Sequence, residues 1–185
     1  MLSRISLKTF FRLSLLFSFI ASGGTLHVQG EDTSLDDAPL AEVNGHPFVI
    51  VTIIDKSSDM DARVAPFRER LLRDAFEDAI KSSPLNYAYT LRFQEGKSVE
   101  YVPELIIEIA DWKYVGSNAF ECSAQAKFID ALKNNHNLKG SIGVESTLTW
   151  AGSSAEMEEY LEASARRVFE KLLRRILKKG LYRAG

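Results

Sequence analysis

Residues 46–55 read HPFVIVTIID, a nearly continuous run of apolar and β-branched residues between polar stretches. Such a run is typical of a central strand that is covered on both faces. After a polar turn, residues 65–84 (APFRERLLRDAFEDAIKSSP) place apolar side chains three and four positions apart. That spacing predicts an amphipathic helix that begins near Pro66 and ends before Pro84.

Four further segments have the pattern of strands, with apolar residues at alternate positions over most of their length. They are NYAYTLRF (86–93), PELIIEIADWKY (103–114), AFECSAQAKFID (119–130) and SIGVESTLTW (141–150). Residues 115–118 (VGSN) are short enough to join the middle two as a hairpin. Residues 133–140 (KNNHNLKG) predict a longer, polar connection between the last two.

A second amphipathic helix is predicted to begin near Ser154, where Ser153 or Ser154 can cap the first free N–H groups. Gly180 is the expected left-handed residue at its end. One continuous apolar stripe along this helix must lie on the sheet. The stripe consists of Met157, Leu161, Ala165, Val168, Phe169, Leu172 and Ile176.

This order, β-α-β-β-β-β-α, predicts an α+β fold with a mostly antiparallel sheet of about five strands and both helices packed on one face. The chain has 185 residues, of which 45% are hydrophobic and 26% are charged. These are globular proportions, and we expect residues 45–185 to form a single domain. Residues 31–44 (EDTSLDDAPLAEVN) are acidic and contain few apolar residues, which predicts a flexible leader.

The first thirty residues are predicted to be a secretory signal peptide. Three basic residues and no acid precede or overlap a short apolar run at residues 13–20, and small residues follow. The run is shorter than the roughly 20 residues needed to span a bilayer. Residues 21–23 and 28–30 both fit the small-residue rule for cleavage. Since no N-glycosylation signal is present, we expect a protein exported to a bacterial periplasm or secreted.

Cys122 is the only cysteine, so the chain cannot form an internal disulfide. Its neighbours at alternate positions, Phe120, Ala124, Ala126 and Phe128, are apolar, whereas the positions between them are polar. This pattern predicts a small buried hydrophobic side chain at Cys122 and not a reactive thiol.

The C-terminal end is strongly basic, with eight Lys and Arg residues and one acid among residues 166–185. Basic residues at a helix C-terminus interact favourably with the helix dipole, but this excess is larger than the dipole requires. Leu173 and Leu177 also widen the apolar arc of the helix. One interpretation is contact with an anionic surface, such as phospholipid or lipopolysaccharide headgroups, through residues of this end. These candidate binding residues are Arg174, Arg175, Leu177, Lys178 and Lys179. The other interpretation is a core helix with a solvated basic face.

Trp112 and Tyr114 are the other candidate binding residues. They fall on the same face of their strand as Ile106 and Ala110. If the helices cover the opposite face, the two aromatic side chains are exposed and available as anchors for a partner. The alternative is that they fill gaps in the core at the sheet edge.

No catalytic site is predicted. The His, Cys and acidic residues have no metal-ligand spacing, and the chain has no nucleophile, phosphate-binding or dinucleotide-binding motif. We therefore expect no cofactor and no metal. Nucleic acid is not an expected partner either, because an exported protein is separated from the nucleic acid of the cell and because no predicted strand has a basic and aromatic surface.

The order of elements resembles that of the small exported α/β envelope proteins, which include the LptE-like lipopolysaccharide-assembly lipoproteins and the LpoB-like activators of peptidoglycan synthases. The resemblance covers roughly residues 46–179, including FRERLLRDAFEDAI (67–80) and the strands PELIIEIADWKYVG (103–116) and FECSAQAKFIDA (120–131). It implies non-enzymatic work on an envelope partner. Those proteins carry a lipidated N-terminal cysteine, which is missing here.

The sequence thus predicts an exported, non-catalytic protein that binds a protein partner in cell-envelope assembly or maintenance. The alternatives are a carrier of a lipid or other small ligand and an enzyme without a local motif.

Overall fold

The computed structural model describes residues 42–43, 46–57, 65–85, 87–116, 118–147 and 152–181. The predicted signal peptide and most of the predicted leader lie outside these residues. The strands are β1 (Glu42–Val43), β2 (His46–Asp55), β3 (Ala88–Arg92), β4 (Glu104–Val115), β5 (Ala119–Ile129) and β6 (Asn135–Ser146). The helices are a short 3-10 turn, η3 (Ala65–Phe67), followed by α2 (Arg68–Lys81), and the long α3 (Ser154–Lys178).

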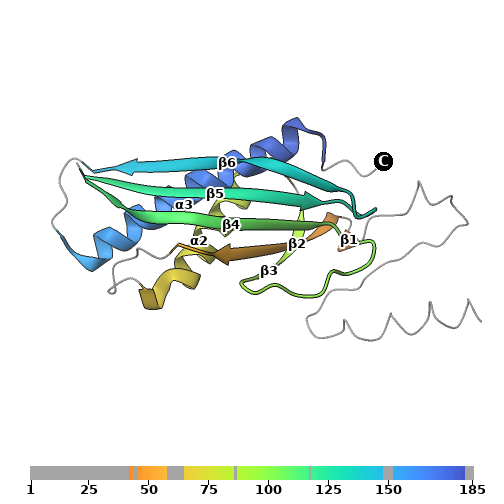
Figure 1. Cartoon of the computed structure of the whole chain (residues 1–185), viewed down its shortest axis with the longest axis horizontal. Helices are drawn as coiled ribbons and strands as arrows, with labels where there is room; N and C mark the ends of the chain where they lie inside the picture. The colour runs from red at the N-terminus through yellow and green to blue at the C-terminus, as the bar shows by residue number, and fades with distance from the viewer. Residues whose placement is uncertain are drawn as a thin grey trace, which may run out of the picture.

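The sheet is mixed (Figure 1), so the prediction of a mostly antiparallel sheet holds for β4, β5 and β6 and is wrong for the pairs that β2 makes with β3 and β4. β2 lies between β3 and β4 and is parallel to both. β4, β5 and β6 follow as antiparallel neighbours. The physical reason is the helix between β2 and β3, because a helical crossover returns the chain to the sheet in the same direction. β1 adds a two-residue antiparallel pairing at the start of β2.

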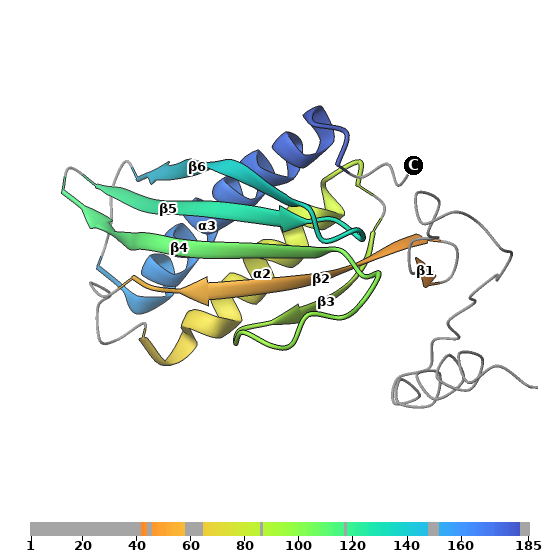
Figure 2. The same cartoon turned by 45° about the vertical axis from the view of Figure 1, so that its right-hand side comes forward.

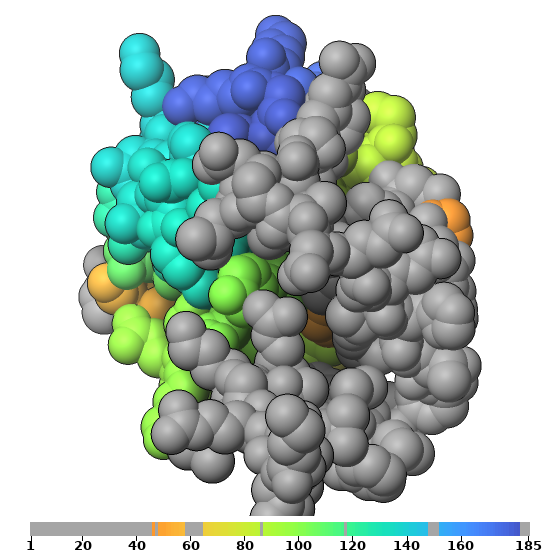
Figure 3. All heavy atoms as spheres, turned by 90° about the vertical axis from the view of Figure 1, so that its right-hand side faces the viewer, coloured from red at the N-terminus to blue at the C-terminus, as the bar shows by residue number. Residues whose placement is uncertain are grey.

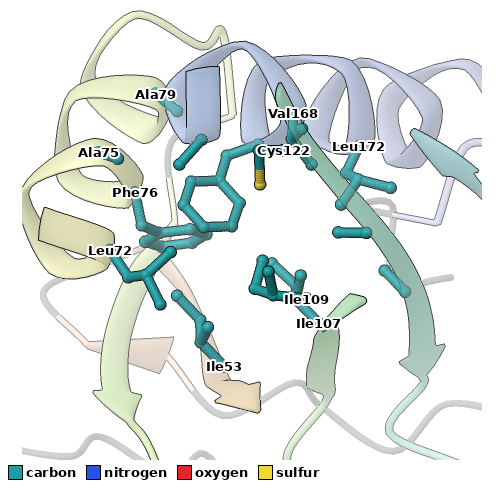
Figure 4. Close-up of a cluster of buried hydrophobic side chains, with 14 of the residues drawn as sticks. Ile53, Leu72, Ala75, Phe76, Ala79, Ile107, Ile109, Cys122, Val168 and Leu172 are labelled. Carbon is teal, nitrogen blue, oxygen red and sulfur yellow. The ribbon is translucent and has the colours of Figure 1, made fainter. Parts of the chain in front are cut away.

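Both helices cover one face of the sheet, as predicted, and no helix among the described residues covers the other, which we call the open face (Figures 1 and 2). Alternate residues of β2, β4 and β5 point to the helices and meet the apolar stripes of α2 and α3 in one core (Figure 4). β2 is buried on both faces from Val49 to Ile53, which confirms its predicted central place. Cys122 is fully buried in this core, and burial first, with nearby acids in addition, raises the pKa of its thiol.

The ends of α3 are those that its sequence predicts. The Ser153 hydroxyl accepts a hydrogen bond from the Glu156 N–H at 3.2 Å, which satisfies one of the free donors of the first turn. At the other end, Gly180 has a φ of 68°. The N–H groups of Gly180 and Leu181 bond back to the carbonyls of Leu177 and Ile176, the arrangement of a Schellman motif.

Two β-bulges lie at the same level on either side of β5. β4 has an extra residue, Ala110, between the pairs that β5 makes with Ile109 and Asp111. β6 has an extra residue within Lys139–Gly140, opposite Gln125 of β5. Since side chains alternate between the faces with a period of two, one extra residue moves every later side chain of the strand to the other face.

β6 begins earlier than the sequence predicts. Residues 135–140 (NHNLKG), interpreted as part of a loop, are the first half of the strand. Their polar composition is compatible with a strand because β6 ends the order of strands in the sheet, and its open face is solvated. The later part of β6 runs to Ser146, and residues 148–150 of the predicted strand lie outside the described residues.

α3 crosses β6 at Gly143 with its backbone close to the strand. A Cβ atom placed on Gly143 would lie 2.1 Å from the backbone oxygen of Ser164, a distance that no side chain can adopt. Ser164 is itself fully buried, and its hydroxyl donates to the Leu161 carbonyl at 2.7 Å. Glycine is therefore required at this point of β6 because the helix occupies the space of a side chain.

Candidate functional site

A row of basic side chains from α3 lies along the outer edge of β6. Lys171, Arg175 and Lys179 follow one another at intervals of four residues, so they project from one side of the helix. We call them the basic row. In the space-filling view the blue end of α3 lies directly against teal residues of the β5–β6 region (Figure 3).

The basic row donates hydrogen bonds to backbone carbonyls of β6. Lys171 Nζ bonds the carbonyl of Ile142, and Lys179 Nζ bonds that of Asn137 at 3.1 Å. Arg175 Nη1 bonds two carbonyls at the bulge, that of Lys139 and that of Gly140 at 2.7 Å. These carbonyls point away from β5, where the described residues place no further strand. The row thus satisfies acceptors that an edge strand leaves unpaired.

The same part of β6 exposes two apolar side chains on the open face. Ile142 is 52% exposed and Val144 is 42% exposed. They are two residues apart and lie opposite Ser123 and Glu121 of β5. We call them the exposed apolar pair. The basic row and the exposed apolar pair together form the β6 edge surface, which is the candidate functional site.

Trp112 does not lie on the open face, so that expectation is wrong. The extra residue Ala110 turns the strand over, and Trp112 points to the helices with none of its surface exposed. Its Nε1 donates a hydrogen bond to the Leu161 carbonyl of α3 at 3.0 Å. The indole therefore holds α3 on the sheet, and it is not available as a surface anchor.

Tyr114 is on the same side of β4 as Trp112, near the β4–β5 hairpin, and 41% of it is exposed. Its ring packs 5.2 Å from that of Phe120. Its hydroxyl lies 3.3 Å from both the side-chain oxygen and the backbone N–H of Asn118, and it can donate to the first and accept from the second. Tyr114 thus helps to close the hairpin, and its role in partner binding stays a prediction.

The predicted residues at the end of α3 fall into three groups. Arg175 and Lys179 belong to the basic row. Arg174 and Lys178 are exposed on the helix surface, and Arg174 lies 3.7 Å from Glu170. Leu173 is buried, and Leu177 is partly buried against the core. The apolar part of the predicted membrane-binding surface is therefore largely used inside the protein, and its exposed part consists mainly of charges.

The open face near the middle of the sheet carries charges that are already paired. Lys56 and Gln125 contact the Glu108 carboxylate at 2.9 and 3.0 Å, and these hydrogen bonds, that of Lys56 first, lower the pKa of Glu108. The Ser123 hydroxyl donates to Asp111 at 3.1 Å. Paired charges of this kind are typical of a solvated sheet face, so they do not single out a binding surface here.

The described residues contain no group of three or more His, Cys, Asp or Glu side chains that could hold a metal ion. An apolar cavity of about 10 Å³ lies in the core between β2, α2 and α3, lined among others by Val49, Phe76 and Leu173. This volume holds at most about one water molecule. Neither helix in the described part of the chain combines the length and hydropathy that crossing a bilayer requires.

The basic end of α3 is evident in the sequence, but its contacts are not. The four-residue spacing of Lys171, Arg175 and Lys179 was visible, whereas the acceptors are backbone carbonyls, which have no sequence signal. The exposure of Ile142 and Val144 is not evident either, because the bulge that turns these side chains outward has no signal in the sequence pattern.

No known family model and no curated protein sequence matches this chain. Solved structures that align with this chain include PelC of Paraburkholderia phytofirmans, a dodecamer, at 14% identity, with a TM-score of 0.41 and coverage of 82% of this chain and 95% of that one. A protein from Xanthomonas campestris is 14% identical, with a TM-score of 0.46 over 72% and 85% of the two chains. A minor lipoprotein from Acinetobacter baumannii is 10% identical, with a TM-score of 0.28 over 70% and 90%. None of these three reaches a TM-score of 0.5, so the function has to be argued from the residues of this chain.

Proposed function

We propose that this chain is an exported, non-catalytic protein of the bacterial cell envelope that binds a protein partner through the β6 edge surface. Export rests on the predicted signal peptide of residues 1–30. The choice of surface rests on one observation, which is that the exposed apolar side chains of the edge strand lie beside a row of cations from α3. Protein interfaces combine an apolar centre with a polar or charged rim, and the β6 edge surface offers both within one strand and one helix.

The contrast with the rest of the open face supports this choice. Near the middle of the sheet, the charged side chains contact charged or polar neighbours: Glu108 pairs with Lys56, and Asp111 contacts Lys113 and Ser123. On β6, Ile142 and Val144 bring apolar area to solvent without an apolar neighbour opposite them on β5. Burying such area against a partner would be favourable by about 25 cal/mol per Å².

Two other functions have weaker support. A lipid or lipopolysaccharide surface would meet Arg174 and Lys178, but the leucines that should insert beside them face the core. Binding would then depend on charge alone, at about 1 kcal/mol per basic residue close to an anionic membrane. A carrier of a lipid requires an internal volume of several hundred Å³, whereas the cavity in the core has about 10 Å³.

The test is site-specific photo-crosslinking in the source cells. A photoreactive phenylalanine analogue replaces Ile142 in one strain and Phe67 in another, since Phe67 is also exposed but begins the helical layer. We expect a discrete protein adduct from position 142 that disappears when Lys171 and Arg175 are changed to Glu, and no such adduct from position 67. Equal adducts from both positions, or none from position 142, would contradict the proposed function.

A further inference from the structure

The backbone of β6 is suited to accept another strand. In an antiparallel pair, a residue whose carbonyl points away from its neighbour strand also directs its N–H away from it. The carbonyls of Asn137 and Ile142 are bonded by side chains of α3 and not by β5. The N–H groups of the same two residues therefore also point outward. An incoming strand would find donors and acceptors along this edge.

The basic row covers the acceptors of this edge but does not remove them. Each bond from Lys171 or Lys179 to a carbonyl is made by a long, flexible side chain at the protein surface, and an exposed contact of this kind is weak. A strand that adds to β6 replaces each of these donors with a backbone N–H. The displaced ammonium or guanidinium group then needs a new partner.

An acidic strand supplies that partner. If the incoming segment carries Asp or Glu beside the edge, each released cation pairs with a carboxylate while the carbonyl that it leaves gains an N–H donor. The exchange conserves the hydrogen bonds of β6 and adds ion pairs. A neutral strand would leave the released cations without a partner, and a basic strand would repel them.

We propose, resting on the protein-binding function above, that the partner of the β6 edge surface is an extended acidic polypeptide segment, which adds to the sheet as a strand next to β6. Apolar side chains at alternate positions of that segment contact Ile142 and Val144 on the open face, and its acidic residues meet Lys171, Arg175 and Lys179. Backbone pairing accounts for affinity, and the basic row accounts for selection of the acidic sequence.

The same row excludes a second copy of this chain from the edge. Two β6 strands side by side would bring together two sets of Lys171, Arg175 and Lys179. β6 itself carries one base, Lys139, and one acid, Glu145, and Glu145 is already paired with Arg167 at 2.6 Å. Like charges at such distances are unfavourable, and charged residues along an edge strand are a known protection against edge-to-edge association. The edge is therefore closed to its own copy and open to an acidic strand.

The test uses the full chain and three labelled peptides of twelve residues in a fluorescence anisotropy titration. The first alternates Glu with Val, the second replaces each Glu with Asn, and the third replaces each Glu with Lys. We expect the Glu peptide to bind at least about tenfold more tightly than the Asn peptide, and the Lys peptide not to bind. Binding of the Glu peptide should weaken as salt is added. Equal affinity for the Glu and Asn peptides would overturn the proposal.

Variants at one position separate strand pairing from charge. Ile142→Pro removes the outward N–H of this edge residue and leaves the basic row in place, and proline is tolerated in a strand where its missing N–H faces solvent. Ile142→Thr is the matched control, which keeps the N–H and the β-branched shape. We expect Ile142→Pro to lower the affinity for the Glu peptide by about tenfold and Ile142→Thr to lower it by about twofold or less. If the proline variant binds the Glu peptide as the unaltered chain does, the contact is not a strand addition and the proposal fails.

A charge-reversal variant gives a result even if the proline variant does not fold. With Lys171 and Arg175 both changed to Glu, the preference should invert, so that the Lys peptide binds and the Glu peptide does not. If the reversed variant still prefers the Glu peptide, the basic row does not select the sequence and the proposal is overturned.

Vesicles of phosphatidylglycerol distinguish a lipid partner. The proposal requires that the Glu peptide binds the chain, either together with vesicles that saturate the chain or in competition with those vesicles. Vesicle binding without any peptide binding would overturn it. If the peptides fail while the crosslink from position 142 persists, the proposed function stands and only the acidic strand is wrong.

Discussion

β4 and β6 have the same length, twelve residues, and both lie beside β5, yet they use their apolar residues in opposite ways. Each strand contains a bulge that inverts its alternation. In β4 the inversion brings Trp112 into the core, whereas in β6 it turns Ile142 and Val144 to solvent. The difference is decided by α3, which leaves room for an indole at Leu161 and leaves no room for any side chain at Gly143.

A shift of one residue in β4 just before Trp112 is expected to have the largest effect. One alanine inserted between Asp111 and Trp112 moves Trp112 to the open face and removes its bond to the Leu161 carbonyl, so the free energy of unfolding should fall by about 4 kcal/mol or more. Urea denaturation measures the change. One alanine inserted after Gln94, which is exposed in the connection between β3 and β4, is the control and should cost little. A loss below about 1 kcal/mol for the insertion in β4 would mean that the alternation of this strand does not set the side of Trp112.

A side chain at Gly143 tests the other strand. Gly143→Ala places a methyl group against the Ser164 backbone of α3, and the helix must move away from β6. We expect a loss of about 3 kcal/mol in the free energy of unfolding. Gly116→Ala is the matched control, because nothing lies within 4 Å of a Cβ atom at that position. Equal stability of the two variants would show that α3 does not approach β6 closely.

Trp112→Phe keeps an aromatic ring in β4 and removes the indole N–H. The smaller ring leaves a cavity and the Leu161 carbonyl loses one of its donors, so we expect a loss of about 2 kcal/mol in the free energy of unfolding. Ile142→Thr, at a position that is half exposed on β6, should change it by less than about 0.5 kcal/mol. Comparable losses in the two variants, measured by thermal denaturation, would remove the contrast between the strands.

The smallest effect concerns α3 itself. Burial, together with the charges of Asp74 and Asp78, raises the pKa of Glu162. A carboxyl group whose pKa is raised on folding is destabilising when ionised, and the folded state regains stability as the pH falls through that raised pKa. Glu162→Gln should therefore stabilise the protein slightly at pH 7, and its advantage should disappear below the ordinary carboxyl pKa. Denaturation at several pH values checks this, and an advantage that grows as the pH falls would contradict it.

The elements with strong local patterns could be predicted from sequence. β2 follows from its continuous apolar run, and the ends of α3 follow from Ser153 and Gly180. The parallel pairing of β2 with β3 was not predicted, because the sequence of a short strand does not indicate whether its neighbour runs parallel or antiparallel to it. The faces of Trp112, Ile142 and Val144 were also missed, since a single extra residue inverts the alternation and neither Ala110 nor Lys139–Gly140 announces a bulge.

The candidate site was predicted only in part. The excess of bases near the end of α3 pointed to this region, and Arg175 and Lys179 do lie on the β6 edge surface. Leu177 was interpreted as part of an apolar binding arc, but it packs against the core. Which side of a helix meets a sheet depends on the tertiary arrangement. When the apolar arc of a helix is wide, the sequence does not show which residues at its edges are buried.

The close contact between α3 and β6 matters for chains that are still incomplete, because α3 is made last. All the described strands precede α3 in the chain, so a growing or emerging polypeptide presents the full edge of β6 before the helix that supplies Lys171, Arg175 and Lys179 exists. Until then, Gly143 lacks the helix that covers it, and the core side of the sheet is open. Ribosome-bound or partly exported chains that end before Ser154 should therefore be prone to pairing with other strands, and they are natural clients for a holding chaperone.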